Sequence, residues 1–213
     1  MRDDPRSHGL WEHSAPPAPP TANLNDRLAA DVVVIGAGYT GLSAALHLAE
    51  AGASAVVLEA VEVGFGCSGR NVGLVNAGLW LMPDALISQL GEVYGVRLLE
   101  LLGEAPSLVF GLIEKHAISC EVARSGTLHC AVGAKGLAEL EERARQWKAR
   151  GAPVHLLDQS QTAQTVGTDA YAGSLLDLRA GTIQPLAYAR GLAGAAIKAG
   201  ARIFTSSPVI DAQ

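Results

Sequence analysis

The sequence is poor in charged residues and has no excess of basic ones. Asp, Glu, Lys and Arg together make up 17% of its 213 residues, and the formal net charge is −5. Binding nucleic acid or an anionic membrane surface through bulk charge requires clustered basic residues, so this composition excludes both modes. Hydrophobic residues make up 49% of the chain, which is typical of a folded protein and excludes a largely disordered one.

Cysteine is scarce as well, and no secretory signal is visible. Cys67, Cys120 and Cys130 are odd in number and lack metal-ligand spacing. We therefore expect reduced thiols in a cytoplasmic protein, with no disulfide framework and no metal site. The polar N-terminus has no apolar signal core. An uncharged run of 18 residues, 32–49, carries three glycines in its first ten positions, so it predicts a strand, a turn and a helix rather than a membrane span.

The run from residue 31 predicts a βαβ unit. Val32–Ile35 is a short, β-branched apolar run, which is typical of a strand buried on both faces. Apolar residues at helical spacing follow over Leu42–Ala51, and Gly52 ends that helix. Ala55–Leu58 then predicts a second buried strand, parallel to the first.

The turn after the first strand has the glycine spacing of dinucleotide-binding proteins. It runs Gly36-Ala37-Gly38-Tyr39-Thr40-Gly41, with glycine where a tight turn, a close approach to pyrophosphate and close helix packing need it. The helix that begins here points free N–H groups at phosphates. Glu59 lies 18 residues after Gly41 at the end of the second strand, where a carboxylate binds ribose hydroxyls and repels a 2′-phosphate. The turn predicts FAD or NAD, and not NADP; the alternative is a glycine-rich turn in an unrelated α/β protein.

A second glycine-rich stretch over residues 64–78 favours FAD over NAD. It is longer than an ordinary connection, and loops of that length are usually functional. Ser68, Arg70 and Asn71 supply a hydroxyl, a cation and an amide that can hold phosphate or the edge of a flavin ring. For Arg70 we favour such a role, with a salt bridge that closes the loop as the alternative.

Four segments carry a resemblance to a known family. They are DVVVIGAGYTGLSAALHLAEAG (31–52), VVLEA (56–60), GFGCSGRNVG (64–73) and GTIQPLAYARGLAGAAIKAGARI (181–203). With these segments the chain resembles the FAD-dependent oxidoreductases of the D-amino-acid oxidase family, in the gamma-glutamylputrescine oxidoreductase-like branch. The N-terminal HGLWEHSAPP is similar to the lead of that branch. Cys67 and Val72 depart from the family, which usually has alanine and glycine there; we expect Cys67 to be a packing residue.

The resemblance implies an α/β fold: a Rossmann-type FAD-binding domain of glutathione-reductase-like topology, followed by the start of an α+β substrate domain. FAD is the implied cofactor. Gly36 to Gly41 would lie at its pyrophosphate and Glu59 at its ribose, and Ala60 would also belong to the cofactor-binding residues. Ser68, Gly69, Arg70 and Asn71 would lie beside the pyrophosphate and the isoalloxazine. The backbone of Val209 would hold the adenine.

The whole chain divides into four expected segments. They are a polar arm (1–30), which Trp11 would anchor, the FAD-binding βαβ unit and flavin loop (31–80), a helical segment with part of a substrate domain (81–180), and an incomplete return to the FAD-binding domain (181–213). Helices are expected over 86–102, 106–116, 136–148 and from Pro185 to Gly200, with strands over 127–132 and 201–204. Asp158 is expected to cap a short helix that ends at Val166.

The resemblance implies oxidation of a C–N bond of a small amine or amino acid by hydride transfer to FAD. The implied electron acceptor is dioxygen. No catalytic residue is assigned, because no catalytic base is visible and direct hydride transfer from a neutral amine would not require one. The individual substrate is not named, because the resemblance implies that most substrate-selecting residues lie outside these 213 residues. Two alternatives stay open: a catalytically incompetent fragment or nucleotide-binding module, and an NAD-dependent dehydrogenase.

Overall fold

The structure is a computed structural model that describes residues 9–212, so the first eight residues of the expected arm lie outside it. The chain divides into two compact units. Unit 1 comprises Met1–Gly73, Leu112–Glu121 and Ile183–Gln213, and unit 2 comprises Leu74–Gly111 and Val122–Thr182. Within the described residues, no helix combines the length and apolar character that a membrane span requires.

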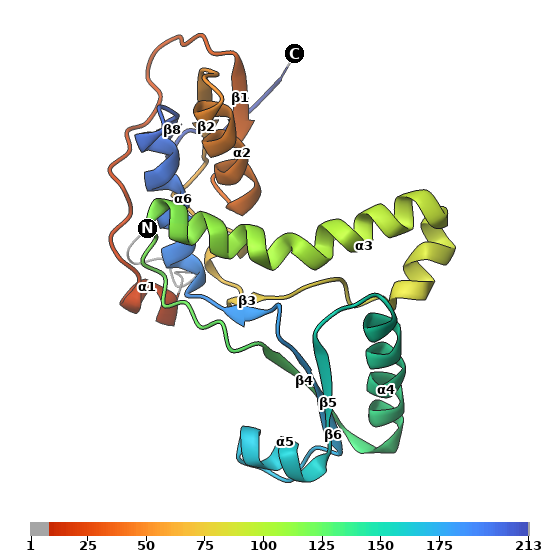
Figure 1. The fold of residues 1–213 in the computed structure, drawn as a ribbon. Coiled ribbons are helices and arrows are strands. Elements are labelled where there is room, and N and C mark those ends of the chain that lie inside the picture. The colour runs from red at the N-terminus through yellow and green to blue at the C-terminus, as the bar shows by residue number, and fades with distance from the viewer. Residues whose placement is uncertain (1–8, 213) are drawn as a thin grey trace. The chain divides into compact units, whose positions relative to one another are not determined.

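Unit 1 is built on a three-stranded parallel sheet in the order β1-β2-β8 (Figure 1). Its elements are α1 (Leu10–Ser14), β1 (Val32–Ile35), α2 (Tyr39–Glu50), β2 (Ala55–Leu58), the 3-10 helix η1 (Cys67–Gly69), α6 (Pro185–Lys198) and β8 (Arg202–Phe204). The register of β1 and β2 runs from Val32 opposite Ala55 to Ile35 opposite Leu58. The expected parallel βαβ unit is therefore confirmed.

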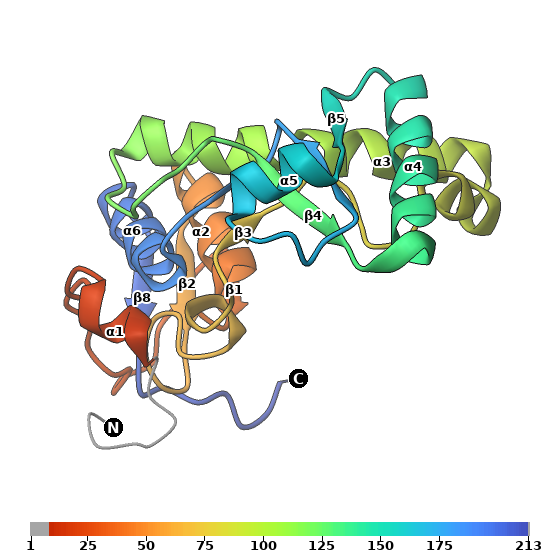
Figure 2. The same ribbon diagram turned by 90° about the horizontal axis from the view of Figure 1, so that it is seen from below.

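Helices α2 and α6 pack against each other beside this sheet (Figures 1 and 2). Leu42 and Leu46 are fully buried on α2, as are Leu186 and Leu192 on α6, because apolar residues at helical spacing share one face. Helix α6 begins at Pro185, as the sequence predicts. Proline is suited to the first position of a helix, because the N–H that it lacks would have no acceptor within the helix there.

Strand β1 differs from the prediction, because one of its faces is exposed. Val33 and Ile35 are 55% and 66% exposed. The opposite face carries Val34, which lies close to Gly41 of α2. β1 is the edge strand of the sheet, and alternate side chains of a strand point to opposite faces. Helix α2 therefore covers only one face of β1, and the expectation of burial on both faces is wrong.

Unit 2 contains an antiparallel sheet in the order β4-β6-β5 and a separate antiparallel pair, β3 with β7. Its elements are β3 (Leu74–Val75), most of α3 (Pro83–His116), β4 (Thr127–Ala131), α4 (Gly133–Ala149), β5 (Val154–Leu157), α5 (Gln159–Val166), β6 (Gly173–Asp177) and β7 (Gly181–Thr182). Strands β5 and β6 are absent from the expectations above. The expected cap of α5 is present, since Asp158 accepts a hydrogen bond from the Gln161 amide.

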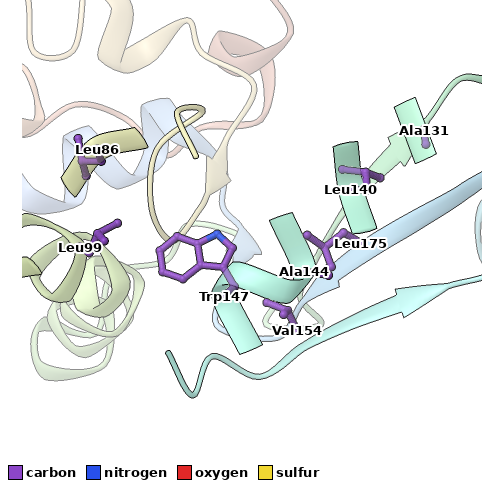
Figure 3. Close-up of a cluster of buried hydrophobic side chains, with 8 residues drawn as sticks. All are labelled: Leu86, Leu99, Ala131, Leu140, Ala144, Trp147, Val154 and Leu175. Atoms are coloured by element: carbon purple, nitrogen blue, oxygen red, sulfur yellow. The ribbon is translucent and has the colours of Figure 1, made fainter. Parts of the chain in front are cut away.

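The core of unit 2 gathers around Trp147 of α4 (Figure 3). In Figure 3 the indole lies between Leu86 and Leu99 of α3 and the buried side chains of α4 and the sheet. The buried members of this cluster are Leu86, Leu99, Ala131, Leu140, Ala144, Trp147, Val154 and Leu175. One large aromatic ring thus connects the helices to the sheet within this unit.

Helices are expected over 86–102 and 106–116, with a break before Pro106, but α3 is two helices joined at a kink at Gly91, where φ is 76° and ψ is 164°. The second of these helices continues through Pro106. Proline lacks the N–H that would bond the carbonyl four residues earlier. That carbonyl, of Leu102, accepts a hydrogen bond of 3.1 Å from the Gly78 N–H. A partner outside the helix thus satisfies the freed carbonyl at the position where the sequence predicts a break.

Candidate functional site

The Gly36–Gly41 turn joins β1 to α2 and requires glycine at two positions for different reasons. Gly36 has φ +97°, a conformation that side chains disfavour, although a Cβ there would meet no atom within 4 Å. A Cβ on Gly41 would lie 2.1 Å from the Gly36 carbonyl oxygen. The turn therefore brings the start of α2 against the end of β1 and leaves open space above Gly36. A helix N-terminus in that setting is suited to bind phosphate.

Glu59 lies at this turn, as the spacing predicts. Its Oε2 accepts a hydrogen bond from the Ala37 N–H at 2.8 Å, and Oε1 accepts one from the Val61 N–H at 2.9 Å. The carboxylate follows β2, the strand next to β1, so the sheet itself places it beside the turn. Each carboxylate oxygen can accept more than one hydrogen bond. Glu59 therefore retains acceptor capacity for ribose hydroxyls.

Ser68 and Asn71 brace the turn from the second glycine-rich loop. Ser68 Oγ accepts a hydrogen bond from the Tyr39 N–H at 3.0 Å, and a Cβ on Gly38 would lie 2.9 Å from this oxygen. Asn71 Nδ2 donates to the Ser68 carbonyl at 2.9 Å and to the Tyr39 hydroxyl at 3.2 Å. Asn71 Oδ1 accepts from the Gly73 N–H at 2.8 Å. The structure thus brings the two predicted loops together through side chains that the sequence singles out.

Tyr39 connects this network to α6. Its hydroxyl donates a hydrogen bond to the Pro185 carbonyl at 3.0 Å, and its ring meets that of Tyr188 edge-on at 5.2 Å between centroids. Burial raises the pKa of Tyr39 to about 12, while the hydrogen bond from Asn71 lowers it. The side chain therefore stays neutral and acts as a structural donor and acceptor at physiological pH.

The remaining predicted residues lie around this network. Arg70 is exposed, and its guanidinium lies over the Phe65 ring at 4.5 Å from the centroid. Gly69 is buried in η1, whereas Cys67 of the same element is an exposed free thiol, so the expectation that Cys67 is a packing residue is wrong. Thr40 and Ala60 are exposed. The loop therefore offers one cation, stacked on an aromatic ring, at its surface.

Val209 follows β8 on a segment that passes Glu59. The Ser207 N–H donates to the Glu59 carbonyl at 2.9 Å, and the Glu59 N–H donates to the Phe204 carbonyl at 2.8 Å. Val209 is 38% exposed and comes two residues after Ser207. The tertiary fold thus brings the end of the chain to the edge of the turn.

Gly73 and Trp11 belong to the site although neither is among the predicted binding residues. A Cβ on Gly73 would lie 2.1 Å from the Ile183 carbonyl oxygen, and its φ is +76°. Trp11 Nε1 donates to the Asn71 carbonyl at 3.0 Å, so the expected anchoring of the arm is present in the structure. The sequence signal for Gly73 is its place at the end of GFGCSGRNVG. No feature of the sequence near Trp11 identifies the Asn71 carbonyl as its partner.

The part of the chain that the structure describes holds no group of three or more metal-ligating side chains. Cys120 is buried and free, and burial raises the pKa of its thiol to about 11. Reactive cysteines have lowered pKa values, so Cys120 is a packing residue.

The sequence of this chain also matches known proteins. A family model described as "FAD dependent oxidoreductase" matches residues 31–213. The gamma-glutamylputrescine oxidoreductase of Escherichia coli K12 is 40% identical over 200 residues, which cover 91% of this chain and 46% of that protein. The probable oxidoreductase OrdL of Haemophilus influenzae is 39% identical over 184 residues, which cover 85% of this chain and 42% of that protein. The chain therefore spans a little under half the length of these relatives.

Solved structures confirm the expected fold. Glycine oxidase from Geobacillus kaustophilus matches with a TM-score of 0.71 at 22% identity, over 86% of this chain and 48% of that one. An L-amino acid deaminase from Proteus myxofaciens, solved with anthranilate, matches with a TM-score of 0.73 at 22% identity. The match covers 91% of this chain and 41% of that one. At this identity the likeness shows the fold alone.

Proposed function

This chain belongs to the family of FAD-dependent oxidoreductases, and we propose that the whole protein oxidises a C–N bond of a small amine or amino acid. The names of three of the proteins compared above support the substrate class, since each contains an amine or an amino acid. FAD is the cofactor of the family.

The observation that carries the proposal is the paired arrangement of the glycine turn and Glu59. The Glu59 carboxylate lies 2.8 Å from the Ala37 amide, so the carboxylate and the glycine turn lie side by side, which supports neighbouring sites for ribose and pyrophosphate. We propose that Gly36–Gly41 holds the pyrophosphate and that Glu59, with Ala60 beside it, contacts the ribose. Ser68, Gly69, Arg70 and Asn71 would lie beside the pyrophosphate and the ring. The backbone of Val209 would hold the adenine.

We propose that the residues of this chain bind and orient, because the cofactor supplies the redox chemistry when bound. In the overall reaction the substrate would lose a hydride from carbon and a proton from nitrogen and become an imine. Dioxygen, the proposed terminal acceptor, would take up two electrons and two protons to give hydrogen peroxide. No residue of this chain is assigned as a catalytic base.

We further propose that the two compact units have different roles. Unit 1 carries every predicted FAD-binding residue, from Gly36 to Val209, and would bind the cofactor. Unit 2 would begin the substrate domain, because it carries an antiparallel sheet that is separate from the parallel sheet of unit 1.

The test uses protein expressed from the complete reading frame that contains residues 1–213. FAD and NADH are titrated separately against apoprotein, and a panel of amines and amino acids is then screened for hydrogen peroxide release. We expect FAD binding, no NADH binding, and peroxide release with at least one amine or amino acid. Binding of NADH without FAD, or a flavoprotein that oxidises none of the panel, would refute the proposal.

A charge reversal tests the ribose assignment. Glu59→Lys replaces the acceptor with a cation and removes the hydrogen bond from Ala37, so we expect a large loss of FAD affinity. Glu141→Lys is the matched control, because Glu141 is exposed on α4 in the other unit. Equal affinities for the two variants would refute the assignment of Glu59.

A further inference from the structure

We propose that Trp11, in the short N-terminal helix α1, is a positioning residue for the flavin-binding loop. This inference rests on the proposed function, because it assigns to Trp11 a role in holding the loop that would contact FAD. The family model begins at residue 31, so α1 lies outside the matched region.

Trp11 is bonded on one side to the loop and on the other to α6. Its indole Nε1 donates to the Asn71 carbonyl at 3.0 Å, and its own carbonyl accepts from Gln184 Nε2 at 2.9 Å. Gln184 also caps α6, since its Oε1 accepts from the Ala187 N–H at 2.6 Å. Trp11 therefore connects the fixed start of α6 to the backbone of the loop.

The residue that Trp11 holds supports the glycine turn. Asn71 braces the Ser68 carbonyl and the Tyr39 hydroxyl, and Ser68 Oγ in turn accepts from the Tyr39 N–H at the start of α2. A displacement of Asn71 would move Ser68 and so disturb the phosphate-binding end of α2. The indole is thus one end of a chain of hydrogen bonds that leads to the turn.

Side-chain contacts, not burial, hold α1 in place. The helix has only five residues and buries none of them, and so short a helix is not stable alone. Arg190 of α6 is 7% exposed and bonds both carboxylate oxygens of Glu12 at 2.8 and 2.9 Å. Its Nη1 donates to the Pro16 carbonyl at 3.0 Å. Figures 1 and 2 show α1 beside α6.

The decisive variant is Trp11→Phe, which keeps an aromatic ring and removes the Nε1 donor. Trp147→Phe is the matched control, because it makes the same chemical change in the core of unit 2. Both are made in protein from the complete reading frame. FAD affinity is measured by quenching of flavin fluorescence, and the environment of bound flavin by its visible absorption band. Hydrogen exchange of the Cys67–Gly73 amides is measured without FAD.

We expect the dissociation constant for FAD to rise about three- to tenfold in Trp11→Phe, as the loss of one hydrogen bond of ordinary net strength implies. The flavin band should shift and the loop amides should exchange faster, while Trp147→Phe changes none of the three. Wild-type values in Trp11→Phe, or equal changes in both variants, would overturn the inference and leave the proposed function standing. Wild-type protein that binds no FAD would overturn both.

Discussion

Gly41→Ala should destabilise the protein, because the added methyl group has no room. Its Cβ would lie 2.1 Å from the Gly36 carbonyl oxygen and 3.1 Å from Val34 Cγ1. A carbon and an oxygen in contact normally lie about 3.3 Å apart or more, so a backbone carbonyl would have to move by about 1 Å. Overpacking of this kind costs about 1–3 kcal/mol, and a backbone obstacle places the cost at the upper end.

A second effect of the substitution stabilises the folded protein, but it is smaller. Gly41 lies in α2, where alanine is favoured over glycine by about 1 kcal/mol. We therefore expect a net loss of about 2 kcal/mol from a total stability of about 5–15 kcal/mol. For a chain of this size that corresponds to a fall in Tm of roughly 4–8 °C.

Urea unfolding followed by circular dichroism measures this loss, with Gly194→Ala as the matched control. Gly194 lies in α6, and a Cβ there would meet no atom within 4 Å. The same substitution should therefore raise stability by about 0.5–1 kcal/mol. If Gly41→Ala unfolded at the wild-type urea concentration or above, the argument that α2 packs against the Gly36 carbonyl would be refuted.

Three further predictions follow from hydrogen bonding and burial. Asp158→Ala removes the side chain that accepts from the Gln161 amide, so unfolding measurements should show a loss of about 1 kcal/mol; an unchanged midpoint would contradict the capping role. Glu59→Gln leaves either Ala37 or Val61 without its carboxylate acceptor and should cost about 1–2 kcal/mol in the same assay; stability equal to that of wild type would show that water replaces the bond. Burial raises the pKa of Tyr39 to about 12, above the value near 10 of the unfolded chain. Its contribution to stability is therefore complete below pH 10 and is lost as pH rises from about 10 to 12. Unfolding free energies across this range should fall less steeply in Tyr39→Phe, and equal slopes would contradict the shift.

Local sequence predicts the βαβ part of unit 1 well, because each of its features is encoded within a few residues. The apolar runs of β1 and β2 coincide with the predicted strands, and their parallel pairing follows from the helix between them. The positive φ of Gly36 and the tight approach at Gly41 are the reasons glycine is needed at those positions. Pro185 and Asp158 likewise mark helix starts through chemistry that acts within one turn.

Prediction fails where a distant residue decides the outcome. Pro106 indicates a helix break, yet α3 continues because the Gly78 N–H satisfies the carbonyl that proline leaves free. Val33 and Ile35 indicate burial, but a strand at the edge of the sheet has one face uncovered. Strands β5 and β6 are short, and they are identified by the pairing of β6 with both β4 and β5.

Local sequence is enough to predict a dinucleotide cofactor, FAD or NAD, because glycine spacing and one acidic residue after a strand report on local backbone geometry and charge. The residues that brace the glycine turn are known only from the folded chain. Trp11 and Asn71 are 60 positions apart, and Tyr39 and Pro185 are 146 apart. A hydrogen bond between such residues depends on the path of the whole chain, and no local periodicity records it.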